Sequence, residues 1–181
     1  MTNDPLRLFF ALPCPPHLAA AICAWRTDAL SAGKAVAVHN LHLTLAFLGS
    51  HPASCVAPLL ALAAEIQGER CTLQLDRLGL WRGGLLHLAP SQVPQALERL
   101  QQQLHAHLLA AGFVLEERAF HPHLTLARHY PHQPNCPAPT FDWPLRHFAL
   151  FCSENDGRGT RYRQLGQWPL RPATPAGRSA P

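Results

Sequence analysis

The chain of 181 residues is 48% hydrophobic and only 14% charged, with a formal net charge of +4. This composition predicts a folded core, and the absence of a long basic run excludes duplex binding by charge alone. The small basic excess suits an anionic ligand such as phosphate or RNA. The six cysteines form no C-x-x-C pair, and no apolar run is long enough for a membrane span or a secretory signal. We therefore expect a cytoplasmic monomer with reduced thiols and no membrane partner.

The first half of the chain alternates short apolar runs with alanine- and leucine-rich segments. The patterns predict a strand at residues 7–12, a helix at 16–30, a strand at 41–49 and a helix at 52–67 that begins near Pro58. The first strand is stopped by "PCPP", and the second ends at Gly49. Both stops are typical of strand ends, because proline and glycine interrupt regular structure.

The second half begins with an alternating segment and contains the most regular helix pattern. We predict strands at residues 71–81, 83–90, 120–128, 147–153 and 161–170, and a helix at 91–112. Ser91 is the expected N-cap of this helix and Gly112 its C-cap. Residues 130–140 contain four prolines, which predicts a loop.

The order of elements repeats. Each half has a short strand ending in proline, a helix, a linker and the letters "HLTLA", which begin at His42 and at His123. The repeat predicts an α+β fold of two related lobes about a pseudo-two-fold axis, with antiparallel sheets forming a central cleft and helices outside. We expect residues 1–172 to form this single bilobal domain and residues 173–181 to be a disordered tail.

The repeated motif places an imidazole and a hydroxyl on one face of a strand, because residues i and i+2 share a face. His42 is thereby paired with Thr44, and His123 with Thr125, while the leucines between them fill the core. Two imidazoles facing a cleft suit phosphodiester cleavage or its reverse, in which one neutral histidine accepts a proton and one protonated histidine donates one. The threonines would bind the non-bridging phosphate oxygens. Arg128 is a candidate for extra positive charge, provided the strand does not turn before it.

Other kinds of site fit the sequence less well than this one. The "HPH" pair His121 and His123 has spacing that a zinc site on a strand can use, but no carboxylate cluster, cysteine pair or H-E-x-x-H motif accompanies it. No P-loop, Rossmann or nucleophile-elbow motif occurs, so we expect no metal and no cofactor. The "ENDGRGTRY" segment is most simply a β-turn, and alternatively Arg158 or Arg161 borders the phosphate cleft.

The two "HLTL" motifs resemble those of the two-histidine phosphoesterase superfamily. The flanking segments "RLFFAL", "NLHLTLAFLG", "FHPHLTLAR" and "GRGTRYRQLGQWPL" resemble the RNA 2′,3′-cyclic phosphodiesterases, also named 2′-5′ RNA ligases. The resemblance implies metal-independent hydrolysis of 2′,3′-cyclic phosphate ends of RNA, or of a cyclic nucleotide, to 2′-phosphomonoesters. It also implies that His42 protonates the departing 3′ oxygen, that His123 activates water, and that Thr44 and Thr125 hold the phosphate. Some members of the family join RNA ends through a 2′-5′ bond by the reverse reaction.

One departure and one alternative accompany the resemblance. His87 stands where the family commonly has a tryptophan, which affects any base-stacking role there. The alternative, from a different functional class, is a non-catalytic protein of the same fold that binds RNA ends or nucleotides. The intact histidine and threonine of both motifs favour the enzyme.

Overall fold

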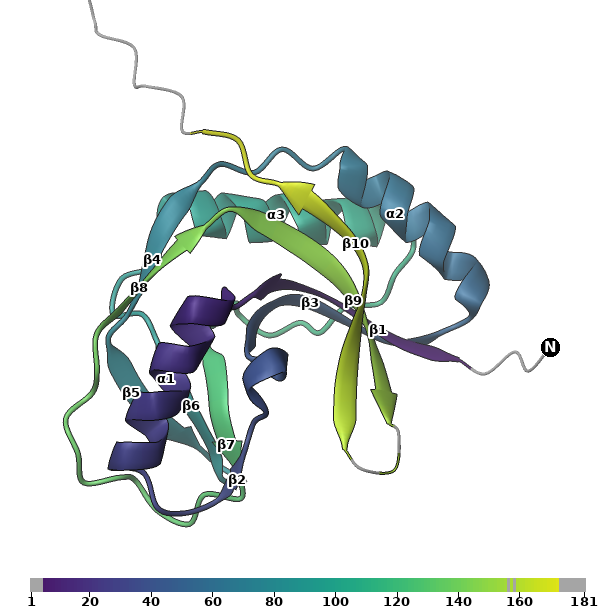
Figure 1. The fold of residues 1–181 in the computed structure, drawn as a ribbon. Coiled ribbons are helices and arrows are strands. Elements are labelled where there is room, and N and C mark those ends of the chain that lie inside the picture. Colours follow the sequence, from purple (N-terminus) through teal and green to yellow (C-terminus); the bar gives the residue numbers. More distant parts are fainter. Residues whose placement is uncertain (1–4, 156, 158, 173–181) are drawn as a thin grey trace, which may run out of the picture.

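The computed structural model describes residues 5–155, 157 and 159–172. The expected tail, residues 173–181, and Arg158 lie outside this range. The elements, shown in Figure 1, follow in the order β1 (Leu6–Pro13), α1 (Pro16–Ala29), β2 (Lys34–Ala35), the 3₁₀ helix η1 (Val38–Asn40), β3 (His42–His51), the 3₁₀ helix η2 (Ala53–Cys55), α2 (Val56–Ala64), β4 (Cys71–Leu75), β5 (Arg77–Trp81), β6 (Leu85–Ala89), α3 (Gln95–Ala110), β7 (Leu124–Arg128), β8 (Phe141–Leu145), β9 (His147–Asn155) and β10 (Thr160–Pro169).

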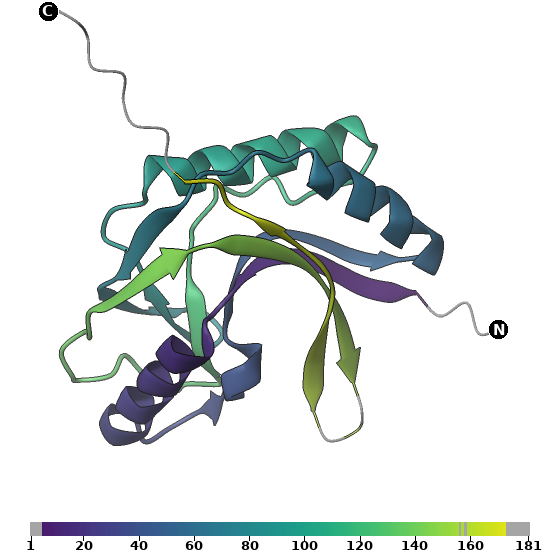
Figure 2. The ribbon, with the colours of Figure 1, turned by 45° about the horizontal axis from the view of Figure 1, so that its top comes forward.

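The main sheet is antiparallel and has the strand order β10-β9-β1-β3-β7-β6-β5, with β2 beside β7. Its two halves meet through the pairing of Leu43 in β3 with Leu124 in β7. Helix α1 lies beside β5, β6 and β7, whereas α2 and α3 lie together over β3 and β10 (Figures 1 and 2). The expected α+β class with antiparallel strands is confirmed. We call β1, β3, β9 and β10 the first half-sheet and β5, β6 and β7 the second.

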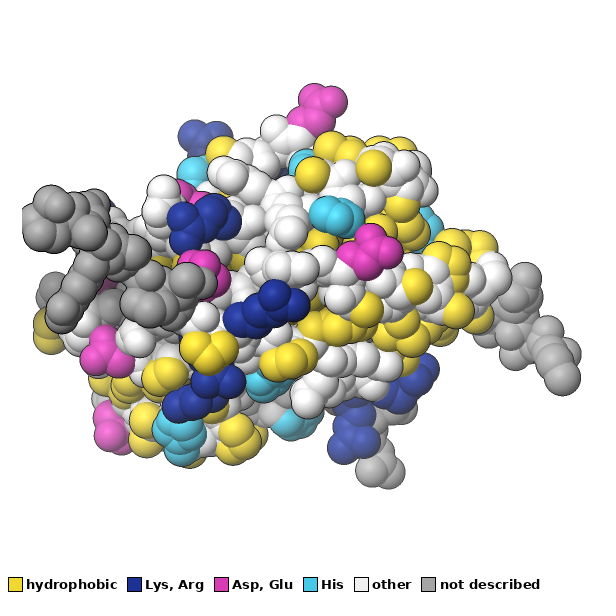
Figure 3. Space-filling view, turned by 90° about the horizontal axis from the view of Figure 1, so that it is seen from above, with side chains coloured by type: hydrophobic (Ala, Val, Ile, Leu, Met, Phe, Trp, Pro, Cys, Tyr) yellow, Lys and Arg dark blue, Asp and Glu magenta, His cyan; other side chains and the backbone are white. Residues whose placement is uncertain are grey.

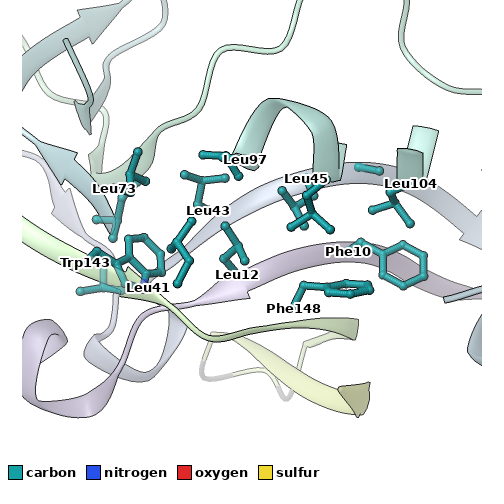
Figure 4. Close-up of a cluster of buried hydrophobic side chains, with 14 of the residues drawn as sticks. Phe10, Leu12, Leu41, Leu43, Leu45, Leu73, Leu97, Leu104, Trp143 and Phe148 are labelled. Carbon is teal, nitrogen blue, oxygen red and sulfur yellow. The ribbon is translucent and has the colours of Figure 1, made fainter. Parts of the chain in front are cut away.

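The core lies between the strands and the helices. Leu43 and Leu45 of β3 and Phe10 and Leu12 of β1 are buried on one face, as strand alternation requires (Figure 4). They meet a stripe of leucines on α3 with helical spacing, at positions 97, 100, 104 and 108. The opposite face of β1 and β3 carries a second, smaller cluster around Phe9, which borders His42.

Residues 71–81, predicted as one strand, are two strands in two sheets. β4 pairs with β8 and β5 pairs with β6, and Asp76 stands between them. The Asp76 carboxylate accepts hydrogen bonds from the backbone N–H and the hydroxyl of Ser91. Ser91 is therefore not the N-cap of α3, which begins at Gln95 after Pro94. The helix ends at Ala110, and Gly112 just beyond it has a φ of 84°, as the expected terminating glycine would.

Strands β2 and β8 were not predicted, and β7 is shorter than the expected strand at 120–128. β8 escaped the pattern because it contains Pro144, which an edge strand tolerates. β7 begins only at Leu124, after Pro122.

None of the described helices combines the length and apolar composition that crossing a bilayer requires. Viewed from above, over the helices, side chains of both charges are scattered among polar and apolar ones (Figure 3).

Candidate active site

The two motifs meet where the half-sheets join. His42 opens β3, His123 immediately precedes β7, and the paired Leu43 and Leu124 lie between them. Antiparallel pairing about these leucines places His42 on the side of Thr125 and His123 on the side of Thr44. The structure thus brings together the four residues that the sequence analysis selected from positions far apart in the chain.

Both imidazoles are oriented in the same way. Nδ1 of His42 lies 2.6 Å from the carbonyl oxygen of Asn40, and Nδ1 of His123 lies 2.8 Å from that of His121. A carbonyl oxygen only accepts, so each Nδ1 carries the hydrogen and donates it. In the neutral ring Nε2 is then the basic nitrogen, so each histidine has a proton-accepting atom left for chemistry.

The electrostatic environment favours the neutral form of both rings. Burial lowers the pKa of His42 below the ordinary 6.5, the positive charges of His123 and Arg128 lower it further, and the hydrogen bond to Asn40 opposes them. Burial also lowers the pKa of His123, with further contributions from His121 and Arg128, against the bond to His121. Arg128 therefore acts on both imidazoles.

A β-bulge explains how Arg128 reaches the histidines. In β7, Thr125 pairs with His87, but the next pair is Ala127 with Leu86, so Leu126 is the extra residue. The bulge shifts the alternation, which turns Ala127 to the core and Arg128 to the face of His123. Arg26 of α1 donates to the carbonyl of Leu126 at 3.0 Å, which holds the bulge in place.

The first motif contains the same irregularity. Thr44 pairs with Ala11 and Ala46 with Phe10, so Leu45 is the extra residue and Phe47 takes the position that corresponds to Arg128. The two half-sheets therefore repeat the bulge as well as the motif, but only the second places a positive charge after it.

Aromatic rings enclose His42. Phe9 of β1 lies 5.1 Å from its ring and Tyr162 of β10 lies 5.0 Å from it, between centroids. A pocket of about 260 Å³ opens beside them, lined also by Asn40 and Phe151. The Asn40 side chain donates from Nδ2 to the carbonyl of Thr160 at 2.6 Å, which ties β10 to the turn before His42. Of the two adjacent phenylalanines, Phe9 lines this pocket and Phe10 lies in the core.

Different groups surround His123. The Trp81 ring lies 4.5 Å from it and the His87 ring 5.6 Å, and these two rings are 4.3 Å apart. Trp81 is 41% exposed. His87 lies over Gly79, where a β-carbon would be 2.7 Å from its Nε2. Sequence reasoning gave Trp81 no role at the site because only the pairing of β5, β6 and β7 brings it there.

Other histidines and arginines singled out in the sequence lie outside the pair of motifs. Within the described ranges, no group of three or more His, Cys, Asp or Glu side chains is placed to hold a metal ion. The His121 side chain is exposed, and its carbonyl contacts His123. Arg161 is an exposed residue of β10.

Comparison with known proteins identifies the family of the chain. The sequence profile of the 2′-5′ RNA ligase superfamily matches residues 14–154. The chain belongs to this superfamily. The RNA 2′,3′-cyclic phosphodiesterase of Escherichia coli is 37% identical over 173 residues, which cover 93% of this chain and 98% of that protein. The protein of the same name from Bacillus subtilis is 30% identical over 72% of this chain and 75% of its own length.

Solved structures of superfamily members have the same fold. Escherichia coli LigT complexed with 3′-AMP superposes with a TM-score of 0.85 at 37% identity, covering 92% of this chain and 98% of LigT. The protein TT0787 of Thermus thermophilus gives a TM-score of 0.78 at 28% identity, covering 93% of this chain and all of its own. The fold of the chain is therefore that of LigT and TT0787.

Proposed function

We propose that the protein hydrolyses 2′,3′-cyclic phosphate ends of RNA to 2′-phosphomonoesters, by acid–base catalysis from His42 and His123. The relatives named RNA 2′,3′-cyclic phosphodiesterase support the reaction class. The observation that carries the assignment of residues is the matched orientation of the two imidazoles. Each donates Nδ1–H to a backbone carbonyl and keeps Nε2 for proton transfer, on opposite sides of the Leu43–Leu124 pair.

In the proposed reaction, Nε2 of His123 takes a proton from water as the water oxygen attacks phosphorus. The bond from phosphorus to the 3′ oxygen breaks, and Nε2–H of His42 protonates that oxygen. The product carries a 2′-phosphate and a free 3′-hydroxyl. His42 must be protonated to act in this way, and the negative charge of the bound phosphate raises its pKa at the moment when this is needed.

Thr44, Thr125 and Arg128 are the proposed phosphate-binding groups. The two hydroxyls lie on the faces that carry the histidines, and the bulge at Leu126 turns Arg128 to the same face. Positive charge and hydroxyl donors stabilise the transition state more than the ground state, because charge on the non-bridging oxygens increases during attack. The same ring opening, with a 5′-hydroxyl attacking phosphorus in place of water, forms a 2′-5′ linkage.

The test is hydrolysis of an oligonucleotide that ends in a 2′,3′-cyclic phosphate, with the product identified as a 2′- or a 3′-phosphate by chromatography. We expect a 2′-phosphate, a rate unaffected by EDTA, and a loss of about 10²–10⁴-fold in kcat for His42→Ala or His123→Ala. The alanine variants should still bind the product, measured by calorimetry. Full activity in either variant would disprove the acid–base assignment, and a 3′-phosphate would reverse the direction of ring opening.

A further inference from the structure

Trp81 is a large aromatic side chain at the site that hydrolysis does not require. It stands on β5, the last strand of the second half-sheet, and its indole is 41% exposed although it contacts the His123 ring at 4.5 Å. The corresponding position in the first half-sheet is Phe151 on β9. Phe151 lies two residues after Ala149, as Trp81 lies two residues after Gly79. Ala149 and Gly79 are equivalent, because each is in register with the threonine of its motif across one intervening strand. Phe151 is only 8% exposed, because β10 continues the sheet beyond it.

The positions of the attacking and leaving oxygens in displacement at phosphorus suggest a binding role for this exposed ring. The attacking and leaving oxygens lie on opposite sides of phosphorus, so each histidine serves one side. With His42 on the side of the departing 3′ oxygen, the nucleoside that carries the cyclic phosphate lies toward His42. The side of His123 receives the other oxygen. That oxygen belongs to water in hydrolysis, and to the 5′-hydroxyl of a second nucleoside in formation of a 2′-5′ linkage.

We propose that the exposed face of Trp81 binds the base of the nucleoside that supplies the 5′-hydroxyl. This inference rests on the proposed function and on its assignment of the two histidines. Water needs no aromatic surface, whereas a nucleoside beside His123 places its base within reach of the indole. Stacking on an aromatic ring is tolerant of sequence because every base has a flat face. The subsite therefore takes any nucleoside with a free 5′-hydroxyl and selects for the presence of a base.

The reverse reaction makes the subsite measurable. In a 2′-5′-linked diadenosine monophosphate, His42 takes the proton of the 3′-hydroxyl, which attacks phosphorus. The bond from phosphorus to the 5′ oxygen breaks, and His123 protonates that oxygen. The products are 2′,3′-cyclic AMP and adenosine, with no other reactant consumed. Adenosine 2′-(methyl phosphate) undergoes the same bond changes and releases methanol in place of adenosine.

The experiment compares kcat/KM for these two diesters in the full chain and its variants. We expect the wild type to prefer the dinucleotide by about 5- to 100-fold, the range that stacking of one base supplies. Trp81→Leu, which keeps apolar bulk but has no flat ring, should bring this preference close to one. Trp81→Phe should retain most of it. A change that only disturbs His123 lowers both rates together and leaves the preference as it was, so a structural role gives a different result.

Tyr162→Leu is the matched control, because it removes a ring from the side of His42. Both substrates use that side equally, so the preference should remain. A preference that survives Trp81→Leu would overturn the inference, as would a wild type that hydrolyses 2′,3′-cyclic AMP but cleaves neither diester. Failure of the wild type to hydrolyse the cyclic nucleotide would instead disprove the proposed function. If circular dichroism shows that Trp81→Leu does not fold, Trp81→Gln makes the same test with a side chain suited to an exposed edge strand.

Discussion

His42 and His123 occupy equivalent positions in the two half-sheets, yet one is enclosed and the other stands near an edge. Phe9 and Tyr162 pack on His42, and Asn40 ties β10 to the turn before it. No strand continues the second half-sheet beyond β5 in the described chain. The ring of Trp81 beside His123 is consequently open to solvent.

This difference distinguishes the proton donor from the proton acceptor, two roles that the duplicated motif alone would assign equally well to either histidine. A histidine beside an enclosed aromatic pocket suits the side that holds the nucleoside, and a histidine near an open edge suits the side that admits water. The extra strand β10, which has no counterpart among the described strands of the second half-sheet, is what makes the distinction. The comparison therefore supports His42 as the acid and His123 as the base, independently of the family resemblance.

The strongest test of this comparison changes the leaving group. On a 2′,3′-cyclic phosphate, alanine at either histidine should cost about 10²–10⁴-fold in kcat. A nucleoside 2′-(4-nitrophenyl phosphate) has a leaving group that departs without a proton, on the side of His123. For this substrate His123→Ala should recover most of its lost activity, whereas His42→Ala should not, because His42 must still take the proton of the 3′-hydroxyl. Release of nitrophenolate is followed by absorbance.

The opposite pattern, with His42→Ala recovered and His123→Ala not, would exchange the two roles. Equal recovery of both variants would show that the surroundings of the two histidines do not distinguish them. The wild type provides the reference for each substrate, so differences in intrinsic reactivity cancel.

The next test removes the charge that only the second half-sheet carries after its bulge. Arg128→Gln should lower kcat/KM by about 10- to 100-fold, since hydrogen bonds to charged groups contribute about 1.5–3 kcal/mol. The positive charge of Arg128 lowers the pKa of both histidines, so its removal raises both. The two limbs of the kcat/KM profile, which in the wild type should centre below pH 6.5, should both move to higher pH.

Lys34 supplies the control, because it pairs with Arg128 across β2 and β7 and is also exposed. Lys34→Gln should change the rate little and leave the pH profile in place. An Arg128→Gln profile that stays fixed, or moves to lower pH, would show that Arg128 does not act on the histidines.

Arg128 also illustrates what the sequence could determine and what it could not. The two-residue period of a strand is local, so the sequence alone predicts that each histidine shares a face with its threonine. A bulge is set by the partner strand, so the sequence could not show that Leu126 shifts the alternation and turns Arg128 inward. Trp81 reaches His123 only through the pairing of β5, β6 and β7, and the alternating run at 71–81 concealed the change of sheet at Asp76.

A smaller effect, on stability, is expected from substituting Gly79, which lies under the His87 ring in the second half-sheet. His87 pairs with Thr125 on one side and with Gly79 on the other. In the first half-sheet, Ala11 pairs in the same way with Thr44 and with Ala149. Gly79→Ala should reduce the free energy of unfolding by about 1–3 kcal/mol, because its β-carbon would overlap the His87 ring. Denaturant unfolding measures the loss.

Adding His87→Ala to Gly79→Ala recreates the pair of alanines found in the first half-sheet. The double variant should be less destabilised than the sum of the two single variants, because the overlap is gone. Additive losses would show that the ring and the glycine are not coupled, and that the correspondence between the half-sheets fails at this position.

The smallest predicted effect concerns the bond that closes the first half-sheet. Asn40→Ala removes the hydrogen bond from Nδ2 to Thr160, which should cost about 0.5–1.5 kcal/mol and increase amide hydrogen exchange in β9 and β10. His121 holds the matching position before His123, but its side chain is exposed, so His121→Ala should change neither quantity measurably. Both variants keep the backbone carbonyl that orients the motif histidine. A selective effect of Asn40→Ala on the hairpin would therefore show that this side chain encloses His42 by anchoring β10, whereas equal responses would mean that the enclosure depends on the packing of Phe9 and Tyr162 alone.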